Sequence, residues 1–174
     1  YTVSPKADLA YHSFSNHKVP FLSESVLLST HKDASGKSKV ADAVLQSNSK
    51  KSNLEFFKVK TSQGVEMDGW MVKPDNFDPN KKYPIIEYVY PGPQTEAVNK
   101  AFSKSMDRTE RLAQFGYIVI TVGNRGGNPS RSKWYHTYGY GNLRDYGLAD
   151  KKAAIEQLAD RHSFIDVNRV GITG

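Results

Sequence analysis

Tyr90 is the residue with the clearest chemical potential, because it ends an apolar run and precedes a turn of proline and glycine. Residues 83–90 lack regular polar alternation, which is typical of a buried strand in a parallel sheet. The Pro-Gly-Pro turn at 91–93 ends that strand, and ligands of open α/β sheets bind at the carboxyl ends of strands. A phenol there either caps the sheet or donates to a developing oxyanion, and position alone favours the cap.

Arg125 lies between glycines just beyond a second apolar strand, residues 117–122. Its guanidinium could meet a carboxylate in a two-point contact, with Asp145 or Asp150 as the partner. We prefer a structural clamp to a substrate contact for this arginine. The aromatic side chains of residues 134–140 either line a cleft or pack their own loop, and the sequence does not rank these two interpretations.

Residues 170–174 (VGITG) form an apolar strand that ends in glycine. This form precedes a nucleophile elbow of sequence G-x-S-x-G, whose serine would be the second residue after Gly174. We therefore expect the chain to be a segment of a longer protein and to be inactive alone.

Several other chemistries are excluded by missing motifs. The chain has no cysteine, and its five histidines show no metal-ligand spacing. Residues 123–127 (GNRGG) lack the G-x-G-x-x-G spacing, and no phosphate-binding G-x-x-x-x-G-K-[ST] loop is present. We expect no cofactor and no metal. The net charge of +6 is scattered over loops, which argues against nucleic acid, and no apolar run approaches the roughly 20 residues of a membrane span.

The first 53 residues have the pattern of antiparallel strands and suggest one blade of a propeller. We expect strands at 9–14, 25–29 and 40–45, a hairpin loop at 31–37 and a polar linker at 47–53. A hairpin of strands 54–60 and 65–72 follows the linker.

From residue 83 onward, apolar strands alternate with helical patterns, which predicts a parallel sheet. The pattern predicts a helix over 106–115 stopped by Gly116, a loop over 123–141, and a helix from Asn142 or Leu143 to about Arg161. Val170, Gly171 and Ile172 form the third core strand.

Three segments resemble the dipeptidyl peptidase IV branch of the prolyl oligopeptidase family. They are residues 82–94 (KYPIIEYVYPGPQ), 123–127 (GNRGG) and 166–174 (DVNRVGITG). Residues 3–5 and 11–15 are similar to the last propeller blade of that family. The resemblance covers nearly the whole chain and is strongest from about residue 54.

This resemblance implies a serine peptidase in which a β-propeller covers an α/β-hydrolase domain, and which removes N-terminal dipeptides, preferably after proline or alanine. Residues 1–53 would be the last blade and residues 54–174 the N-terminal part of the hydrolase domain. Tyr90 matches the oxyanion-stabilising tyrosine, Asp150 matches a usual aspartate, and Gly147 stands where many members have glutamate. The serine, aspartate and histidine of the triad would lie outside this chain.

The expected partner is a peptide substrate, without nucleic acid or a membrane span. Unfinished sheet edges also predict a homodimer or a strand-exchanged oligomer. Bacterial relatives are often exported, so the resemblance implies a periplasmic location. The alternatives are another α/β-hydrolase, such as an acylaminoacyl peptidase or esterase, and a non-catalytic binding module.

Overall fold

The computed structural model describes residues 2–34, 53–90, 92, 95–102 and 108–174. The chain divides into two compact units, one of residues 1–52 with 100–105 and one of residues 53–99 with 106–174. The predicted strand 40–45 and nearly all of the predicted linker 47–53 lie outside the described residues.

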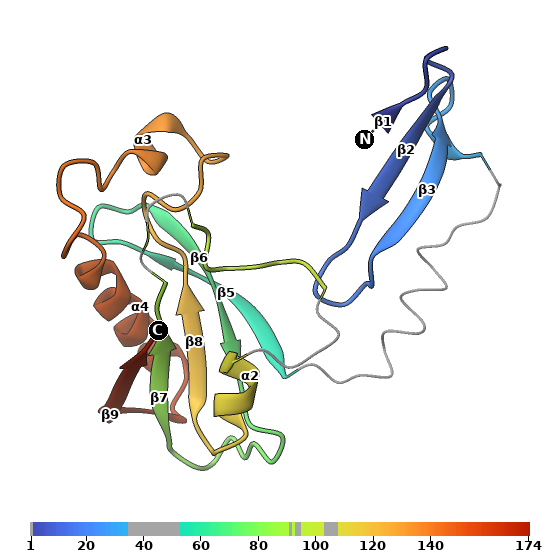
Figure 1. Ribbon diagram of the computed structural model, residues 1–174. Coiled ribbons are helices and arrows are strands. Elements are labelled where there is room, and N and C mark those ends of the chain that lie inside the picture. The colour runs from blue at the N-terminus through green and yellow to red at the C-terminus, as the bar shows by residue number, and fades with distance from the viewer. Residues whose placement is uncertain (1, 35–52, 91, 93–94, 103–107) are drawn as a thin grey trace. The chain divides into compact units, whose positions relative to one another are not determined.

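The first unit contains a four-stranded antiparallel sheet in sequence order (Figure 1). Its strands are β1 (Thr2–Val3), β2 (Leu9–Phe14), β3 (Leu22–Leu27) and β4 (Lys32–Asp33). The prediction for β2 is confirmed. The strand predicted at 25–29 is displaced to Leu22–Leu27, and β4 lies within the predicted loop 31–37, of which residues 35–37 are outside the described residues. Pairing of Phe14 with Leu22 sets the register of β3, and the chain turns at His31, which has a φ of 56°.

The second unit contains a five-stranded mixed sheet in the order β5-β6-β8-β7-β9. Its strands are β5 (Leu54–Lys60), β6 (Glu66–Val72), β7 (Tyr83–Tyr88), β8 (Ile118–Val122) and β9 (Ile165–Thr173). The predicted β5–β6 hairpin is confirmed, and β7 runs parallel to both of its neighbours, β8 and β9. The parallel arrangement predicted from residue 83 onward is therefore confirmed, with β7 between the other two strands (Figure 1).

The helices of this unit are α2 (Arg108–Ala113), α3 (Lys133–His136) and α4 (Leu148–Arg161). Gly116 has a φ of 92° and its amide donates to the Ala113 carbonyl, so it closes the turn after α2, but the helix ends at Ala113, two residues before the predicted end. The predicted start of the long helix at Asn142 or Leu143 is wrong. Turns that include Gly141, at a φ of 81°, delay the helix to Leu148. The structure also adds α3 within the predicted loop.

The last strand is longer than the sequence suggested. Ile165 and Asp166 pair with Tyr83 and Pro84, and pairing resumes at Val170, so residues 167–169 bulge out of the ladder. The polar residues in this bulge resemble a turn, which is why the sequence pattern placed the strand start at Val170.

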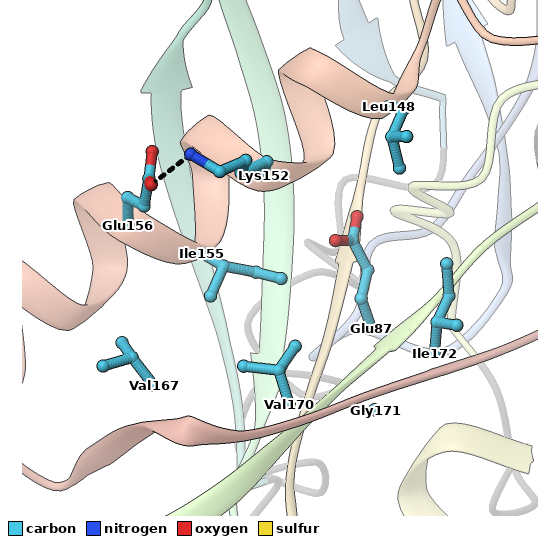
Figure 2. Close-up of a pocket in the computed structure, with 9 residues that line it drawn as sticks. All are labelled: Glu87, Leu148, Lys152, Ile155, Glu156, Val167, Val170, Gly171 and Ile172. Atoms are coloured by element: carbon cyan, nitrogen blue, oxygen red, sulfur yellow. Dashed lines mark hydrogen bonds and ion pairs between the residues drawn. The ribbon is translucent and has the colours of Figure 1, made fainter.

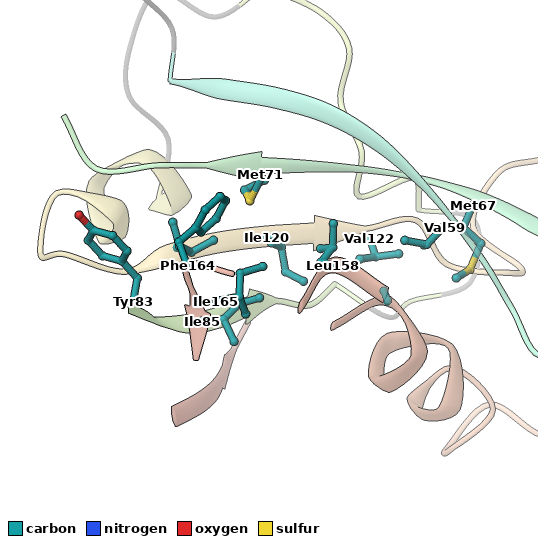
Figure 3. Packing of buried hydrophobic residues seen from close by; sticks show 12 residues of the cluster. Val59, Met67, Met71, Tyr83, Ile85, Ile120, Val122, Leu158, Phe164 and Ile165 are labelled. Carbon is teal, nitrogen blue, oxygen red and sulfur yellow. The ribbon is translucent and has the colours of Figure 1, made fainter. Parts of the chain in front are cut away.

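The sheet carries a helix on each face. Val119 of β8 packs with Ala113 of α2, whereas Ile118 and Ile120 pack with Leu158 of α4, because alternate side chains of a strand point to opposite faces. Figure 3 shows the second of these clusters, where methionine, isoleucine and valine side chains fill the space between sheet and helix. No helix among the described residues is long and apolar enough to cross a membrane.

Candidate active site

Tyr90 lies two residues beyond the end of β7, which corrects the prediction that it is the last residue of the strand. The ladder with β9 ends at Tyr88 and Thr173, and the Val89 amide adds one more bond to the Thr173 carbonyl at 2.8 Å. The Tyr90 side chain is 53% exposed. The phenol is therefore presented to solvent at the carboxyl end of a central strand.

Gly174 lies against the backbone of Val89, which leads to Tyr90, and Figure 1 shows the C-terminus at the end of β7. A Cβ atom added to Gly174 would lie 2.5 Å from the Val89 carbonyl oxygen, closer than any real Cβ contact. Only glycine fits there without a shift of backbone. The carboxyl ends of β7 and β9 consequently lie side by side.

Arg125 is buried and pairs with Asp150 of α4 in a two-point contact. Its Nε donates to one carboxylate oxygen at 2.6 Å and its Nη2 donates to the other at 2.8 Å. Nη1 donates to Gln63 at 2.6 Å, and the guanidinium stacks 3.7 Å from the centre of the Tyr138 ring. Of the two predicted partners, the geometry selects Asp150, because Asp145 precedes the helix and its carbonyl accepts from the Leu148 amide.

The aromatic residues of 134–140 divide into two groups. Tyr135 is buried, and burial raises the pKa of its phenol to about 12. Tyr138 bridges Arg125 and the Trp134 ring, whose centre lies 5.5 Å away. Trp134 and Tyr140 are exposed. The loop is thus packed by some of its aromatic side chains and presents the others to solvent.

Gly147 occupies the N-cap position of α4. A Cβ atom there would lie 2.8 Å from the Asn124 side-chain oxygen, and Asn124 in turn donates to the Tyr146 hydroxyl at 2.7 Å. A glutamate at this position would require Asn124 to move. The absence of a side chain at Gly147 therefore leaves room for the side chain of Asn124, which precedes Arg125.

The sequence analysis missed a buried ion pair between Glu87 of β7 and Lys151 of α4. Both residues are almost fully buried, and the Lys151 Nζ lies 3.7 Å from the Glu87 Oε1. Burial raises the pKa of Glu87 to about 7, although Lys151 opposes the shift. Burial likewise lowers the pKa of Lys151, and Glu87 opposes that shift. One signal was available, since Glu87 is the only charged residue in the run 83–90.

A groove of about 320 Å³ runs between α4 and β9. Its walls are mainly apolar and include Leu148 and Ile155 of the helix and Val170 and Ile172 of the strand, with Glu87 at the floor (Figure 2). Leu148 is 64% exposed, so this apolar residue of α4 faces the groove and not the core. Among the described residues, no group of three or more histidine, aspartate or glutamate side chains could hold a metal ion.

Comparison with known proteins decides the family. Residues 103–174 match the prolyl oligopeptidase family. The chain is 34% identical over 121 residues to dipeptidyl peptidase 8 of Homo sapiens, an alignment that covers 69% of this chain and 13% of that protein. The chain belongs to the prolyl oligopeptidase family. The resemblance seen in the sequence is confirmed.

Other similar proteins show the same relationship. A probable dipeptidyl-aminopeptidase B of Ajellomyces capsulatus (strain H88) is 33% identical over 135 residues, which cover 72% of this chain and 14% of that protein. Among solved structures, a putative dipeptidyl aminopeptidase IV from Bacteroides ovatus has a TM-score of 0.78 at 25% identity. Dipeptidyl peptidase 4 of Porphyromonas gingivalis has a TM-score of 0.75 at 26% identity.

Both solved chains are longer than this one. The matches cover 98% and 97% of this chain and 24% of each solved chain. The chain spans between 13% and 15% of the length of the curated relatives it matches.

Proposed function

We propose that this chain is part of a serine-type dipeptidyl peptidase that releases N-terminal dipeptides after proline or alanine. Residues 1–53 would form the last propeller blade, and residues 54–174 the N-terminal part of the α/β-hydrolase domain. Membership of the prolyl oligopeptidase family supports the proposal. So do the solved structures that share the fold, which are described as dipeptidyl peptidases.

The contact of Gly174 with the backbone of Val89, the residue before Tyr90, is the observation on which the proposal depends. Tyr90 is exposed at the end of β7, and the end of β9 lies against the backbone of Val89. A serine at the second residue after Gly174 would emerge beside the phenol. A nucleophile and an oxyanion donor must lie this close, because both address one carbonyl group of the substrate.

In the proposed mechanism the serine attacks the scissile carbonyl, a histidine removes its proton, and an aspartate orients that histidine. The Tyr90 hydroxyl and a backbone N–H after the serine donate to the oxyanion of the tetrahedral intermediate. Arg125 and Asp150 take a structural role, since their pair holds the loop after β8 against α4. The 174-residue chain alone supplies one oxyanion donor and no nucleophile, so it would be inactive.

The partner expected besides a peptide substrate is a second copy of the chain. Val170 and Ile172 of β9 are half-exposed or more, and β9 lies at one edge of its sheet. An apolar edge strand pairs readily with another strand. The chain expressed alone would accordingly form a homodimer or a strand-exchanged oligomer, which sedimentation at micromolar concentration would detect.

The proposal is tested by expressing the longer protein that contains this chain and assaying it with a glycyl-prolyl chromogenic amide. We expect turnover, and a loss of roughly 100-fold in kcat for Tyr90→Phe, because one oxyanion donor contributes about that factor. Tyr140→Phe removes an exposed phenol from the loop after β8 and serves as the matched control.

Three outcomes would contradict the proposal. A longer protein that cleaves an acylated amino acid amide or an ester, and not the dipeptide amide, would favour the other hydrolases. Equal activity of Tyr90→Phe and the wild type would remove Tyr90 from the mechanism. Turnover by the isolated 174-residue chain would show that the nucleophile lies elsewhere.

A further inference from the structure

The buried pair of Glu87 and Lys151 connects the carboxyl ends of two neighbouring strands. The Lys151 ammonium donates to the carbonyl of Val122, the last residue of β8, and to that of Gly123 at 3.5 Å. Its third contact is Glu87 of β7 at 3.7 Å. One side chain of α4 therefore binds the last residue of β8 and the residue after it through their carbonyl groups, and β7 through a carboxylate.

These anchor points adjoin the residues of the proposed active site. Glu87 precedes Tyr90 by three residues and pairs in the ladder with Ile120 and Ile172. Gly123 precedes Asn124, and its own amide donates to the Asp68 carbonyl at 2.8 Å. A shift of Lys151 would consequently loosen β8 and β7 where both lead into loops at the same edge of the sheet.

The geometry of the pair is poor for a device that only adds stability. The distance of 3.7 Å exceeds that of a hydrogen bond, and the Glu87 Oε1 is buried without a hydrogen-bond partner. Buried ion pairs of this kind are often less stabilising than apolar residues of similar volume. The presence of these two buried charges is therefore better explained by a role in positioning neighbouring residues than by a contribution to stability.

The other charged groups around the pair do not replace either member. Asp150 is held by Arg125, and Asp150 and Glu96 act on Lys151 only through longer-range attraction. Across the groove, Lys152 and Glu156 pair with each other at 2.6 Å on the exposed side of α4 (Figure 2). Lys151 is thus the nearest positive group to the Glu87 carboxylate among the described residues.

We propose that Lys151 and Glu87 are positioning residues that hold the carboxyl ends of β7 and β8 together and thereby aim the Tyr90 hydroxyl at the oxyanion. This inference rests on the proposed function. Neither residue touches substrate in this scheme, since both act through the backbone that leads to Tyr90.

The experiment uses the longer protein and the glycyl-prolyl amide, with the concentration of active sites measured by titration with a covalent serine reagent. We expect Lys151→Met and the isosteric Glu87→Gln to lower kcat by about ten- to a hundredfold with little change in KM, because misplacing a catalytic group acts on the transition state. Lys151→Arg keeps donors and charge and should recover part of the loss. Lys152→Met, at the exposed neighbouring lysine, is the matched control.

Coupling to Tyr90 separates a positioning role from a structural one. In a Tyr90→Phe background, Glu87→Gln and Lys151→Met should cause little further loss, because the group they position is already absent. An active wild type whose kcat per active site is unchanged in Glu87→Gln overturns this inference alone. Full additivity with Tyr90→Phe overturns it as well. An inactive wild type overturns the proposed function, and this inference with it.

Discussion

Two ion pairs on adjacent residues of α4 differ in how well their charges are satisfied. Asp150 receives two donors from Arg125 at 2.6 and 2.8 Å, and Gln63 and the Tyr138 ring satisfy the rest of the guanidinium. Lys151 lies 3.7 Å from Glu87, which keeps a buried oxygen without a partner. Because its buried charges are hydrogen-bonded, the first pair acts as a structural clamp. The second pair keeps part of the desolvation cost of its buried charges uncompensated.

The largest effect is expected from breaking the first pair. Asp150→Asn removes the charge that compensates a buried guanidinium, and the free energy of unfolding should fall by about 3–5 kcal/mol. Chemical denaturation followed by the fluorescence of the buried Trp70 measures this loss. Asp145→Asn, at the aspartate that does not pair with Arg125, should change stability little. Equal effects of both variants would contradict the clamp.

The second pair should make the folding stability of the protein depend on pH. The pKa of Glu87 is raised from 4.5 to about 7, so its contribution to stability is present below pH 4.5 and is lost as the pH rises through 7. The Lys151 pKa is lowered, so its contribution is lost as the pH falls through the folded value. The free energy of unfolding of Glu87→Gln, relative to that of the wild type, should therefore rise by up to about 3 kcal/mol between pH 5 and pH 8. Parallel pH profiles of thermal unfolding for the two proteins would contradict this.

Replacing both members of the second pair sharpens the contrast. The double variant Glu87→Leu/Lys151→Met should be neutral or more stable by about 1 kcal/mol, because apolar side chains fill the same space without a desolvation cost. Urea denaturation measures the change. Activity should still fall if the pair positions Tyr90, so a stable but slow enzyme is the expected result.

The exposed pair of Lys152 and Glu156, on the next residue of the same helix, should contribute least. Both side chains are more than half exposed, and Lys152→Ala should cost no more than about 0.5 kcal/mol and less in high salt. Thermal unfolding at two salt concentrations measures this. A cost comparable with that of Asp150→Asn would mean that burial does not control the three pairs.

Local signals predicted most of the second sheet. Residues 54–60 and 118–122 carry enough β-branched and aromatic side chains to be recognised as strands. Element starts were predicted less well, at Leu22, Leu148 and Ile165. At each of these places, pairing with a distant strand or a succession of turns overrides the local pattern.

In the candidate site, too, some features could be predicted from the sequence and others required the structure. The Pro-Gly-Pro turn located Tyr90 at a strand end, and the glycine after an apolar strand located the approach to a nucleophile elbow. The choice between Asp145 and Asp150 required the structure, because it depends on where α4 begins. The pairing of Glu87 with Lys151 escaped detection, since 64 residues separate them and neither carries a motif.

By itself, the sequence determined most strands of the second sheet, where the family signatures lie, and that a tyrosine follows the first strand of the parallel set. Only the tertiary structure decided that β7 lies between β8 and β9, that Gly174 lies against Val89, and that Glu87 and Lys151 are buried as a pair. The physical reason is the distance along the chain over which each interaction acts. Strand and turn preferences act between neighbours in the chain, whereas burial and ion pairing depend on residues that only the folded sheet and α4 bring together.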